Sequence, residues 1–368
     1  ETALSSVLTE RNEYAEKDGT YEHATLSKEG IYGKTARYDR DFLVSTENKK
    51  YKVTHLGDLC YNPANLKFGV ICLNTYGDAI FSPIYVTFEI EASFDPDFIG
   101  AYLTRWDFIN RALKYQQGTV YERMAVSPED FVSIKCCFPQ KAEQTRLAEF
   151  ITLLDKRIAA QGKYVESLKK YKRGLLSSVF SQNVSLFSTA AFYAFSELAV
   201  RRSEKYDPKC NAHAVCIELE HIEQETGRII GSTCADYQNS IKTVCKPGDV
   251  MFGKLRPYLR KYAFVQKECV CSSEIWSLIP TDIVIPKYLF YLIQSEAFMK
   301  AANVSSGTKM PRAEWSTIAK SGYPIPSKDD QQATVDILET TDRIIVSHVA
   351  SYDRLIEYKK GLLQRLFI

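Results

Sequence analysis

The chain contains one segment twice. Residues 139–181 align without a gap with residues 326–368, at a constant offset of 187 positions. The clearest identities are Tyr171-Lys172 with Tyr358-Lys359, and Gly174-Leu175-Leu176 with Gly361-Leu362-Leu363. A chain that carries two copies of one segment has approximate internal symmetry. Such a molecule is suited to a target with two halves, or to two copies of one partner.

Both copies have the pattern of a long helix. Apolar residues recur at alternating steps of three and four, which forms a continuous seam that needs a partner helix. The seam positions are Leu147, Ile151, Leu154, Ile158, Val165, Leu168 and Leu175 in the first copy, and Leu338, Ile345, Tyr352, Leu355 and Leu362 in the second. Because both copies carry the seam, we expect an antiparallel pair within the chain, which would act as a spacer of roughly 60 Å.

The helix ends and the polar seam positions add detail. Pro139 and Pro326 stand just ahead of the two helices, and Ser327 with Asp330 resembles a capping box. The seam is interrupted by the equivalent pairs Gln161 with His348 and Lys172 with Lys359. Two interpretations stay open for these positions: they set the register of the pair, or the pair also packs against other subunits.

The regions outside the helices are expected to be diverged copies of one α+β domain. Three matches support this: Gly57-Asp58-Leu59 with Gly248-Asp249-Val250, Pro96 with Pro286, and Gly118-Thr119 with Gly307-Thr308. Strand-like runs dominate both regions, and a short amphipathic helix is predicted after each proline. The predicted organisation is a first domain at 1–138, a central helix at 139–184, a second domain at 185–325 and a distal helix at 326–368.

Composition limits the class of protein. With 368 residues, of which 45% are hydrophobic, the chain is expected to form two medium-sized folded domains. No apolar run reaches the length of a membrane span and the N-terminus lacks a signal-peptide pattern, so we expect a cytoplasmic protein. The net charge of +2 argues against coating nucleic acid by bulk charge. Ten cysteines without a CxxC pair indicate reduced thiols and no zinc site.

The order of several strings resembles the specificity subunit of type I restriction-modification enzymes. In the first domain they are Tyr51-Lys52-Val53, residues 57–63 and residues 82–88; in the second they are residues 217–222 and 248–259. A Pro-initiated helix follows each domain, and the resemblance spans nearly all of the chain. Because the chain starts without Met, almost at the first domain, we expect a short leading segment to have been removed.

The resemblance implies a function and partners. Each domain would be a target-recognition domain that reads one half of a bipartite site in double-stranded DNA. The helix pair would set the gap and dock two methyltransferase subunits, and through them the restriction subunits. A rigid spacer would also join two weak readouts into one specific readout.

Catalytic motifs are missing from the sequence. There is no Asn-Pro-Pro-aromatic string and no Gly-rich cofactor loop, and Gly33-Lys34-Thr35 lacks the leading glycine of a phosphate-binding loop. The pairs Glu89 with Glu91 and Glu218 with Glu220 have no nearby Asp and Lys to complete a metal site. We therefore expect a non-catalytic chain with no cofactor and no metal. The alternatives are a protein-binding adaptor, or a nuclease or methyltransferase with an unfamiliar site.

Candidate DNA contacts follow from side-chain type and position. Base readout needs bidentate donors and amides, whereas phosphate contacts need cations, hydroxyls or backbone N–H groups. The preferred candidates lie in two glycine-hinged polar loops: Gly118, Thr119, Tyr121 and Arg123 in the first domain, and Gly307, Thr308, Lys309 and Arg312 in the second. Secondary candidates are Tyr61, Asn62 and Lys67, and Lys254, Arg256 and Tyr258. The competing interpretation is that the two arginines brace each domain against its helix, and that the secondary candidates serve strand packing or are ordinary solvated charges.

Overall fold

The computed structural model describes residues 1–34, 50–118, 124–181, 190–209, 213–235, 239–304 and 310–366. The chain forms two compact units, Glu1–Ala159 with Leu355–Ile368 and Ala160–Arg354. Each unit combines one α+β domain with parts of both long helices. The sequence analysis gave each helix a segment of its own, and those four boundaries remain a prediction. No helix in the described ranges is long and apolar enough to span a membrane.

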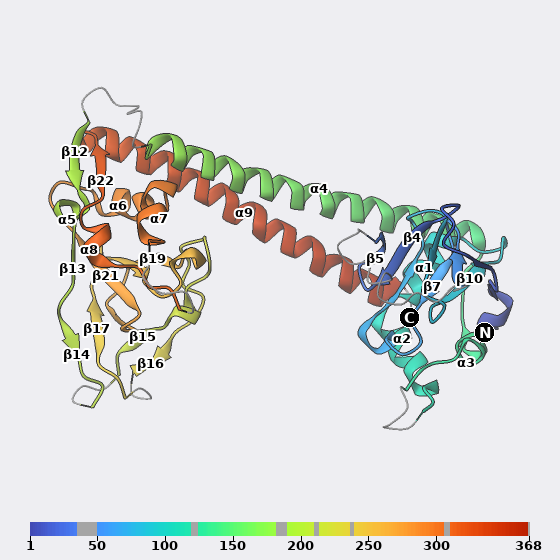
Figure 1. Ribbon diagram of the computed structural model, residues 1–368. Helices are drawn as coiled ribbons and strands as arrows, with labels where there is room; N and C mark the ends of the chain where they lie inside the picture. The colour runs from blue at the N-terminus through green and yellow to red at the C-terminus, as the bar shows by residue number, and fades with distance from the viewer. Residues whose placement is uncertain are drawn as a thin grey trace. The chain divides into compact units, whose positions relative to one another are not determined.

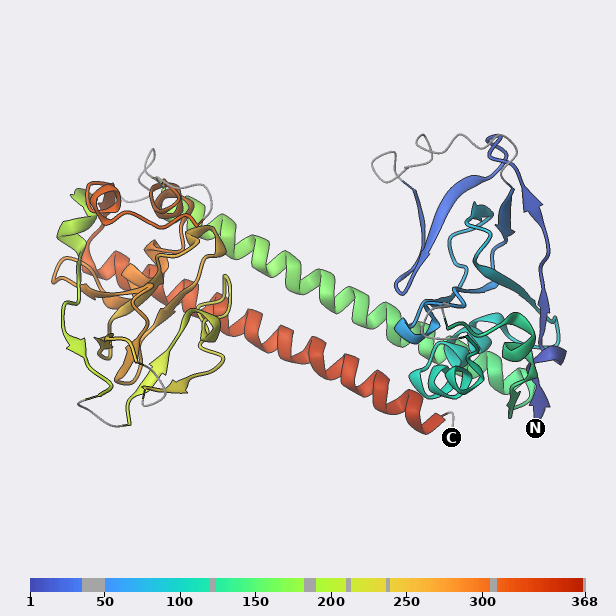
Figure 2. The ribbon, with the colours of Figure 1, turned by 60° about the horizontal axis from the view of Figure 1, so that its bottom comes forward.

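The first domain contains short strands and three helices before the first long helix. Its strands are β1 (Thr2–Ala3), β2 (Leu8–Glu10), β3 (Tyr14–Ala15), β4 (Glu22–Ser27), β5 (Gly30–Gly33), β6 (Tyr51–Thr54), β7 (Leu59–Tyr61), β8 (Ile71–Leu73), β9 (Ala79–Phe81), β10 (Val86–Ile90) and β11 (Lys135–Cys136). Its helices are α1 (Pro96–Leu103), α2 (Trp106–Ala112) and α3 (Pro128–Ser133), followed by α4 (Lys141–Val179). Figure 2 shows the short helices (teal) to one side of the strands (blue).

The second domain repeats this order of elements. Its strands are β12 (Ala191–Ala194), β13 (Ala199–Arg201), β14 (Lys205–Tyr206), β15 (Val215–Ile217), β16 (Thr233–Cys234), β17 (Lys242–Cys245), β18 (Val250–Gly253), β19 (Tyr262–Phe264), β20 (Cys269–Cys271), β21 (Ile275–Pro280) and β22 (Gly322–Ile325). Its helices are α5 (Phe195–Leu198), α6 (Pro286–Leu292), α7 (Glu296–Ala302) and α8 (Trp315–Ile318), followed by α9 (Lys328–Leu366).

The sheet topology is the same in both domains. The first domain has sheets in the orders β2-β10-β7-β8 and β3-β6-β9-β4-β5, and the second has β13-β21-β18-β19 and β14-β17-β20-β15-β16. The two-stranded pairs β1-β11 and β12-β22 also correspond. The parallel pairings β4 with β9 and β15 with β20 fall at equivalent places. The prediction of two copies of one α+β domain is therefore confirmed.

The matched Gly-Asp-Leu and Gly-Asp-Val strings form the same turn in the two domains. Gly57 and Gly248 have φ of +90° and +93°, a region that glycine adopts without steric cost. The following aspartates accept bidentate hydrogen bonds, Asp58 from Arg11 at 2.9 and 3.1 Å and Asp249 from Arg202 at 2.6 and 2.7 Å. Each clamp ties the turn to the strand that enters the domain, because Arg11 follows β2 and Arg202 follows β13.

The ends of the long helices close the domain cores. In the first unit, Ala148 and Ile151 at the start of α4 are part of the core, and Leu363 and Leu366 near the end of α9 pack against it. The equivalent residues of the second unit are Val335, Leu338, Leu176 and Val179. Figure 1 shows the end of α4 beside the start of α9 in this unit. Each core is thus built from one α+β domain and two helix ends.

One glutamine near the start of each long helix attaches it to its domain. The Gln144 side chain accepts a hydrogen bond from the backbone N–H of Asp95, and that of Gln331 accepts one from Ile285. Asp95 and Ile285 are the N-cap residues of α1 and α6, whose N–H groups have no helical partner. The two helices are therefore anchored by the same contact.

Polar residues set the register of the helix pair. The Gln161 side chain donates to the backbone carbonyl of His348, its own repeat equivalent, at 3.1 Å. Lys172 pairs with Asp342 at 2.7 Å in the second unit, and the equivalent Lys359 pairs with Asp155 in the first. These pairings are antiparallel, and all the apolar seam positions named above are buried or half-buried. The polar positions thus pair between the two helices, as the register-setting interpretation expects, and packing against other subunits stays a prediction.

The Arg202–Asp249 clamp generates a stability prediction. Asp249 is buried, and it also accepts hydrogen bonds from Ser277 and from the backbone N–H of Lys246. Asp249→Ala would leave those donors and a partly buried guanidinium without their acceptor, so we expect it to destabilise the second domain by about 3 kcal/mol. Thermal unfolding of the chain measures the loss. Asp282→Ala, at an exposed acid of the same domain, is the control, and an equal effect of both variants would contradict the role of the clamp.

Candidate nucleic-acid interface

The structure brings together the candidates of the second domain that it describes. Residues 254–256 leave β18 and pair with residues 311–313: Ala313 donates its backbone N–H to Lys254, and Arg256 donates to Pro311, both at 2.8 Å. Leu255 and Arg312 form an isolated antiparallel bridge. Lys254, Arg256 and Arg312 therefore lie on two neighbouring segments at one edge of the domain, as a shared interface requires.

The loop after β18 holds Arg256 in an uncommon conformation. Arg256 and Arg260 flank a short 3-10 helix, Pro257–Leu259, with left-handed φ angles of 51° and 50°. Arg260 is secured by an ion pair with Glu296 at 2.6 Å. The Arg256 side chain is exposed and has no hydrogen bond or ion pair within the described ranges, and Tyr258 beside it is also exposed. Uncommon non-glycine backbone conformations are enriched at binding sites, so Arg256 and Tyr258 remain candidates.

Arg312 does not brace the domain against a long helix. Its guanidinium donates to both carboxylate oxygens of Glu274, at 3.0 and 3.3 Å, and Glu274 lies in the turn before β21. This hydrogen bond raises the pKa of the Arg312 guanidinium. The pair is exposed, so solvent or DNA can compete for it. Bracing by Arg312, where it occurs, acts on a turn of its own domain.

The first domain has the corresponding arrangement with other side chains. Val126 donates its N–H to Pro63, which is the equivalent of the Ala313 bond to Lys254. This contact places Pro63 near the bridge between Gln117 and Ala125, and Gly118 next to that bridge has a φ of +128°. Lys67 is exposed with its amine 5.2 Å from the Phe68 ring centroid. Gly118 and Lys67 therefore remain candidates.

Two candidates of the first domain are wrong as DNA contacts. Tyr61 is fully buried, its ring stacks on Phe131 at 4.7 Å, and its hydroxyl donates to the Val126 carbonyl. Asn62 is 6% exposed, and its side-chain oxygen accepts from the backbone N–H groups of Ala64 and Asn65. Sequence alone does not separate a tyrosine or asparagine that packs from one that projects, because strand register decides which face it occupies.

Six candidates lie outside the described residues. They are Thr119, Tyr121 and Arg123 in the first domain, and Gly307, Thr308 and Lys309 in the second. Their proposed contacts with DNA stay predictions.

The sequence analysis missed an apolar stripe on the long helices. Exposed apolar residues occur one position before a seam residue: Phe150, Tyr164 and Tyr171 on α4, and Ile337, Ile344 and Tyr358 on α9. The repeat relates two members of each set, since Phe150 matches Ile337 and Tyr171 matches Tyr358, whereas Tyr164 matches Ser351 and Ile344 matches Arg157. In a two-helix coiled coil this flanking position is normally charged. The seven-residue spacing of aromatic residues is the signal that could have revealed the stripe.

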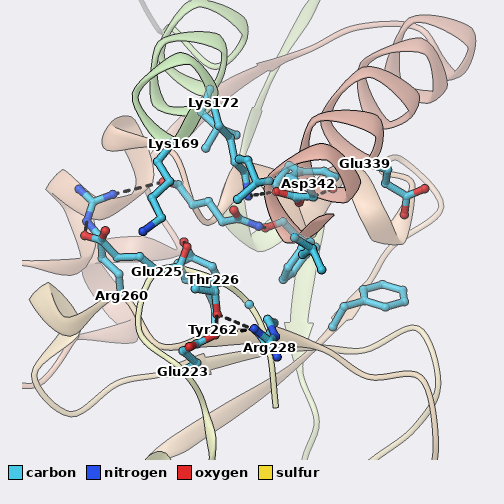
Figure 3. A pocket seen from close by; sticks show the side chains of 18 of the residues that line it. Lys169, Lys172, Glu223, Glu225, Thr226, Arg228, Arg260, Tyr262, Glu339 and Asp342 are labelled. Carbon is cyan, nitrogen blue, oxygen red and sulfur yellow. Dashed lines mark hydrogen bonds and ion pairs between the residues drawn. The ribbon is translucent and has the colours of Figure 1, made fainter. Parts of the chain in front are cut away.

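A pocket of about 590 Å³ in the second unit differs from the candidate interface in the pairing of its charges. It lies between residues 223–228, the strand β19 and the two long helices. Most of its cations face acids: Figure 3 shows Lys172 directed at Asp342, and Arg228 near Glu223. The Tyr291 hydroxyl also donates to Asp342, and burial raises the pKa of this phenol. Because its charges are largely paired, the pocket wall offers little net attraction for a phosphate backbone.

Metal-ligating side chains do not cluster in the described part of the chain. No group of three His, Cys, Asp or Glu side chains there could hold a metal ion. The buried thiol of Cys60 is held neutral, because burial raises its pKa. The arrangement of exposed cations and an amphipathic tyrosine is suited to binding a polyanion.

Comparison with known proteins gives one consistent result. Residues 205–355 match the family described as "Type I restriction modification DNA specificity domain". The chain is similar to the type I restriction enzyme MjaVIII specificity subunit of Methanocaldococcus jannaschii, with 22% identity over 66% of this chain and 63% of the relative. The HindI specificity subunit of Haemophilus influenzae is 28% identical over 37% of this chain and 31% of the relative. Each match thus spans less than two thirds of the relative's length.

Solved structures share the fold over the whole chain. One of them comes from a study of complex assembly and conformational transition of a type I R-M system. The alignment covers 100% of this chain and 96% of that protein, with a TM-score of 0.63 and 15% identity. The type I restriction-modification S subunit from M. genitalium has a TM-score of 0.58 and 15% identity, with 100% and 95% covered.

Arg312 provides the test of this interface. Arg312→Ala removes a fork of donors that fits a guanine edge or a phosphate, so we expect duplex binding by the full chain with its partner subunits to fall about tenfold or more. The melting temperature should stay nearly unchanged, because the Arg312 pair is exposed. Binding is measured by titration with labelled duplex. Lys300→Ala, at an exposed lysine of α7, is the control for loss of one positive charge.

Glu274→Gln separates recognition from bracing. If Arg312 only holds the turn, this variant should reproduce the effect of Arg312→Ala on binding. Such a match, or unchanged binding by Arg312→Ala, would remove Arg312 from the interface.

Proposed function

The chain belongs to the family of type I restriction-modification specificity subunits, and from this we propose that each of its two domains binds one half of a bipartite DNA site. The observation that carries the proposal is the duplication of one domain topology with different exposed side chains. The buried devices repeat, as in Arg11–Asp58 and Arg202–Asp249. Two copies of a scaffold with different surfaces are suited to two different half-sites.

The proposed reading segments share a 3-10 helix but differ in side chains and in the backbone before it, where φ is −109° at Asn65 and 51° at Arg256. A 3-10 helix follows β7 at Leu66–Phe68 and follows β18 at Pro257–Leu259. Around it the first domain presents Lys67, whereas the second presents Arg256 and Tyr258. Arginine can bind guanine through two parallel hydrogen bonds, and lysine acts as a point charge. The two domains would therefore read different sequences.

The helix pair is proposed as the element that sets the gap and docks the catalytic subunits. Each helix is 39 residues long, which is roughly 60 Å at about 1.5 Å per residue. The apolar stripe beside the seam would bind helices of a methyltransferase subunit, because Phe150, Tyr171 and Tyr358 expose large apolar surfaces on the long helices. The repeat relates Phe150 to Ile337 and Tyr171 to Tyr358, which supports two similar docking sites and two methyltransferase subunits. Restriction subunits would join through these.

The proposed role is recognition without catalysis. The methyl transfer and the cleavage would belong to separate subunits, and the chain would supply their sequence specificity. Specificity then depends on two spatially linked binding events, whose combined affinity exceeds either one through effective concentration.

Co-expression tests the function. We expect the chain alone to be inert, and the chain with a type I methyltransferase subunit to methylate adenine in one bipartite motif. Sequencing of DNA modifications in cells with and without the chain is the measurement. Methylation or cleavage by the purified chain alone would contradict the non-catalytic role, and an unchanged methylation pattern with salt-independent retention of other proteins would favour an adaptor.

A double variant, Tyr171→Glu with Tyr358→Glu, separates docking from recognition. It should lose co-purification with the methyltransferase while keeping its own helix content, because both side chains are exposed. Retained co-purification would remove the stripe from the docking surface.

Lengthening the helix pair tests the gap. Four residues inserted after Gln161 and four after His348 extend both helices by roughly 6 Å and nearly preserve the phase of the seam. The pairs Lys172–Asp342 and Lys359–Asp155 each stay on one side of the insertions. We expect both half-sites to stay the same and the gap to grow by about two base pairs, at about 3.4 Å each.

The readout is again the methylated motif. A four-residue insertion in α4 alone is the control, because it shifts one helix against the other and should abolish methylation. An unaltered gap after insertion in both helices would contradict the spacer role.

A further inference from the structure

An arginine outside the interface described above is held on two tryptophan rings. Arg201 ends β13 and is exposed. Its guanidinium carbon lies 4.9 Å from the Trp315 ring centroid and 5.8 Å from that of Trp276. The two indoles contact edge to face, at 5.6 Å and 84°. A guanidinium over an indole face is attracted by the ring quadrupole, so this contact restricts the rotamers of Arg201.

The donors of Arg201 are left unused by the protein. No hydrogen bond or ion pair joins the Arg201 side chain to any residue in the described ranges, whereas the side chain of the next residue, Arg202, is engaged by Asp249. Neighbouring residues of a strand project to opposite faces, which accounts for this difference. An exposed guanidinium that is fixed by stacking but unpaired is preorganised for a planar, bidentate acceptor.

The indoles belong to the segments that carry the candidate interface. Trp276 is paired with Phe252 in the sheet, two positions beyond Glu274, which binds Arg312. Trp315 opens α8, three positions after Arg312. Lys254, Glu274 and Trp276 lie on one face by strand alternation, since Lys254 follows Phe252 by two residues. Arg201 therefore presents its guanidinium at the same edge of the domain as Lys254 and Arg312.

This cluster is absent from the first domain, where the scaffold is repeated. The strand pairings place Glu10, Val86 and Pro128 at the positions of Arg201, Trp276 and Trp315. Glu10 instead accepts a hydrogen bond from the buried Lys52, at 3.1 Å. A device that holds the fold would recur in both copies, as the arginine–aspartate clamps do. A device confined to one copy points to the target of that copy.

We infer that Arg201 is a DNA contact of the second domain, and that Trp276 and Trp315 are positioning residues that hold its guanidinium for a phosphate or a guanine edge. The inference rests on the proposed function, because it takes the second domain to bind duplex DNA. It adds a contact on β13 that is remote in sequence from the glycine-hinged loop.

The test uses the full chain in complex with its methyltransferase subunit. Arg201→Ala should weaken binding to a duplex that carries the bipartite motif about tenfold or more. Arg201→Lys should restore only part of the lost affinity, because lysine lacks the planar fork of donors. Trp315→Phe keeps an aromatic ring in the core and should weaken binding less than Arg201→Ala. Arg228→Ala, at an exposed arginine of the same domain that pairs with Glu223, is the control and should leave binding unchanged.

Two readouts identify what Arg201 contacts. A phosphate contact predicts equal weakening on specific and unrelated duplexes, with the slope of log affinity against log salt reduced by about one. A guanine contact predicts loss confined to the specific duplex, with relaxed preference at one position of one half-site.

The outcomes separate this inference from the proposed function. If the unmodified complex does not bind or methylate a bipartite site, the proposed function fails. If it does, and Arg201→Ala binds as well as the unmodified complex, then Arg201 only covers the indoles and the inference is overturned. A lower melting temperature with unchanged affinity leads to the same conclusion.

Discussion

Closure of each α+β core by two helix ends is the constraint on which the rest of the structure depends. Ile151 and Leu363 serve the first core, and their repeat equivalents Leu338 and Leu176 serve the second. A sheet with one uncovered apolar face is unstable in water, so neither domain is complete without both helices. The same residues thus stabilise the domains and fix the register in which α4 and α9 pair.

Polar contacts define the register of the two long helices and their attachment to the domains. Apolar seams tolerate sliding by one heptad, whereas the ion pairs Lys172–Asp342 and Lys359–Asp155 do not. Gln144 and Gln331 add a directional bond from each helix to the first turn of a short helix in its domain. Both classes of contact occur twice, once in each unit. The repeated sequence therefore repeats the contacts that anchor the helices as well as the fold of the domains.

The comparison of the two copies separates scaffold from recognition. Residues that repeat in type and contact, such as Arg11 and Arg202, hold turns and strands. In the second domain the side chains of Arg256 and Arg201 are exposed and unpaired among the described residues, and the first domain has Asn65 and Glu10 at these positions. Selection for two different half-sites would act on these positions without cost to the core, since they contribute little buried area. Comparison of equivalent positions in the two domains therefore distinguishes structural residues from candidate recognition residues.

The sequence by itself determined the duplication, the two long helices, the α+β class and the family resemblance, because periodicity and repeated strings are local properties of the chain. It did not determine which candidate side chains reach solvent. Tyr61 and Asn62 have the chemistry of DNA contacts, yet strand register and a tight turn placed them inside. Arg201 belongs to one of several basic clusters in the sequence, and only the folded sheet brings it over Trp276 and Trp315, which are distant in sequence. Exposure and long-range contact depend on how separate segments pack, so the tertiary structure alone decided them.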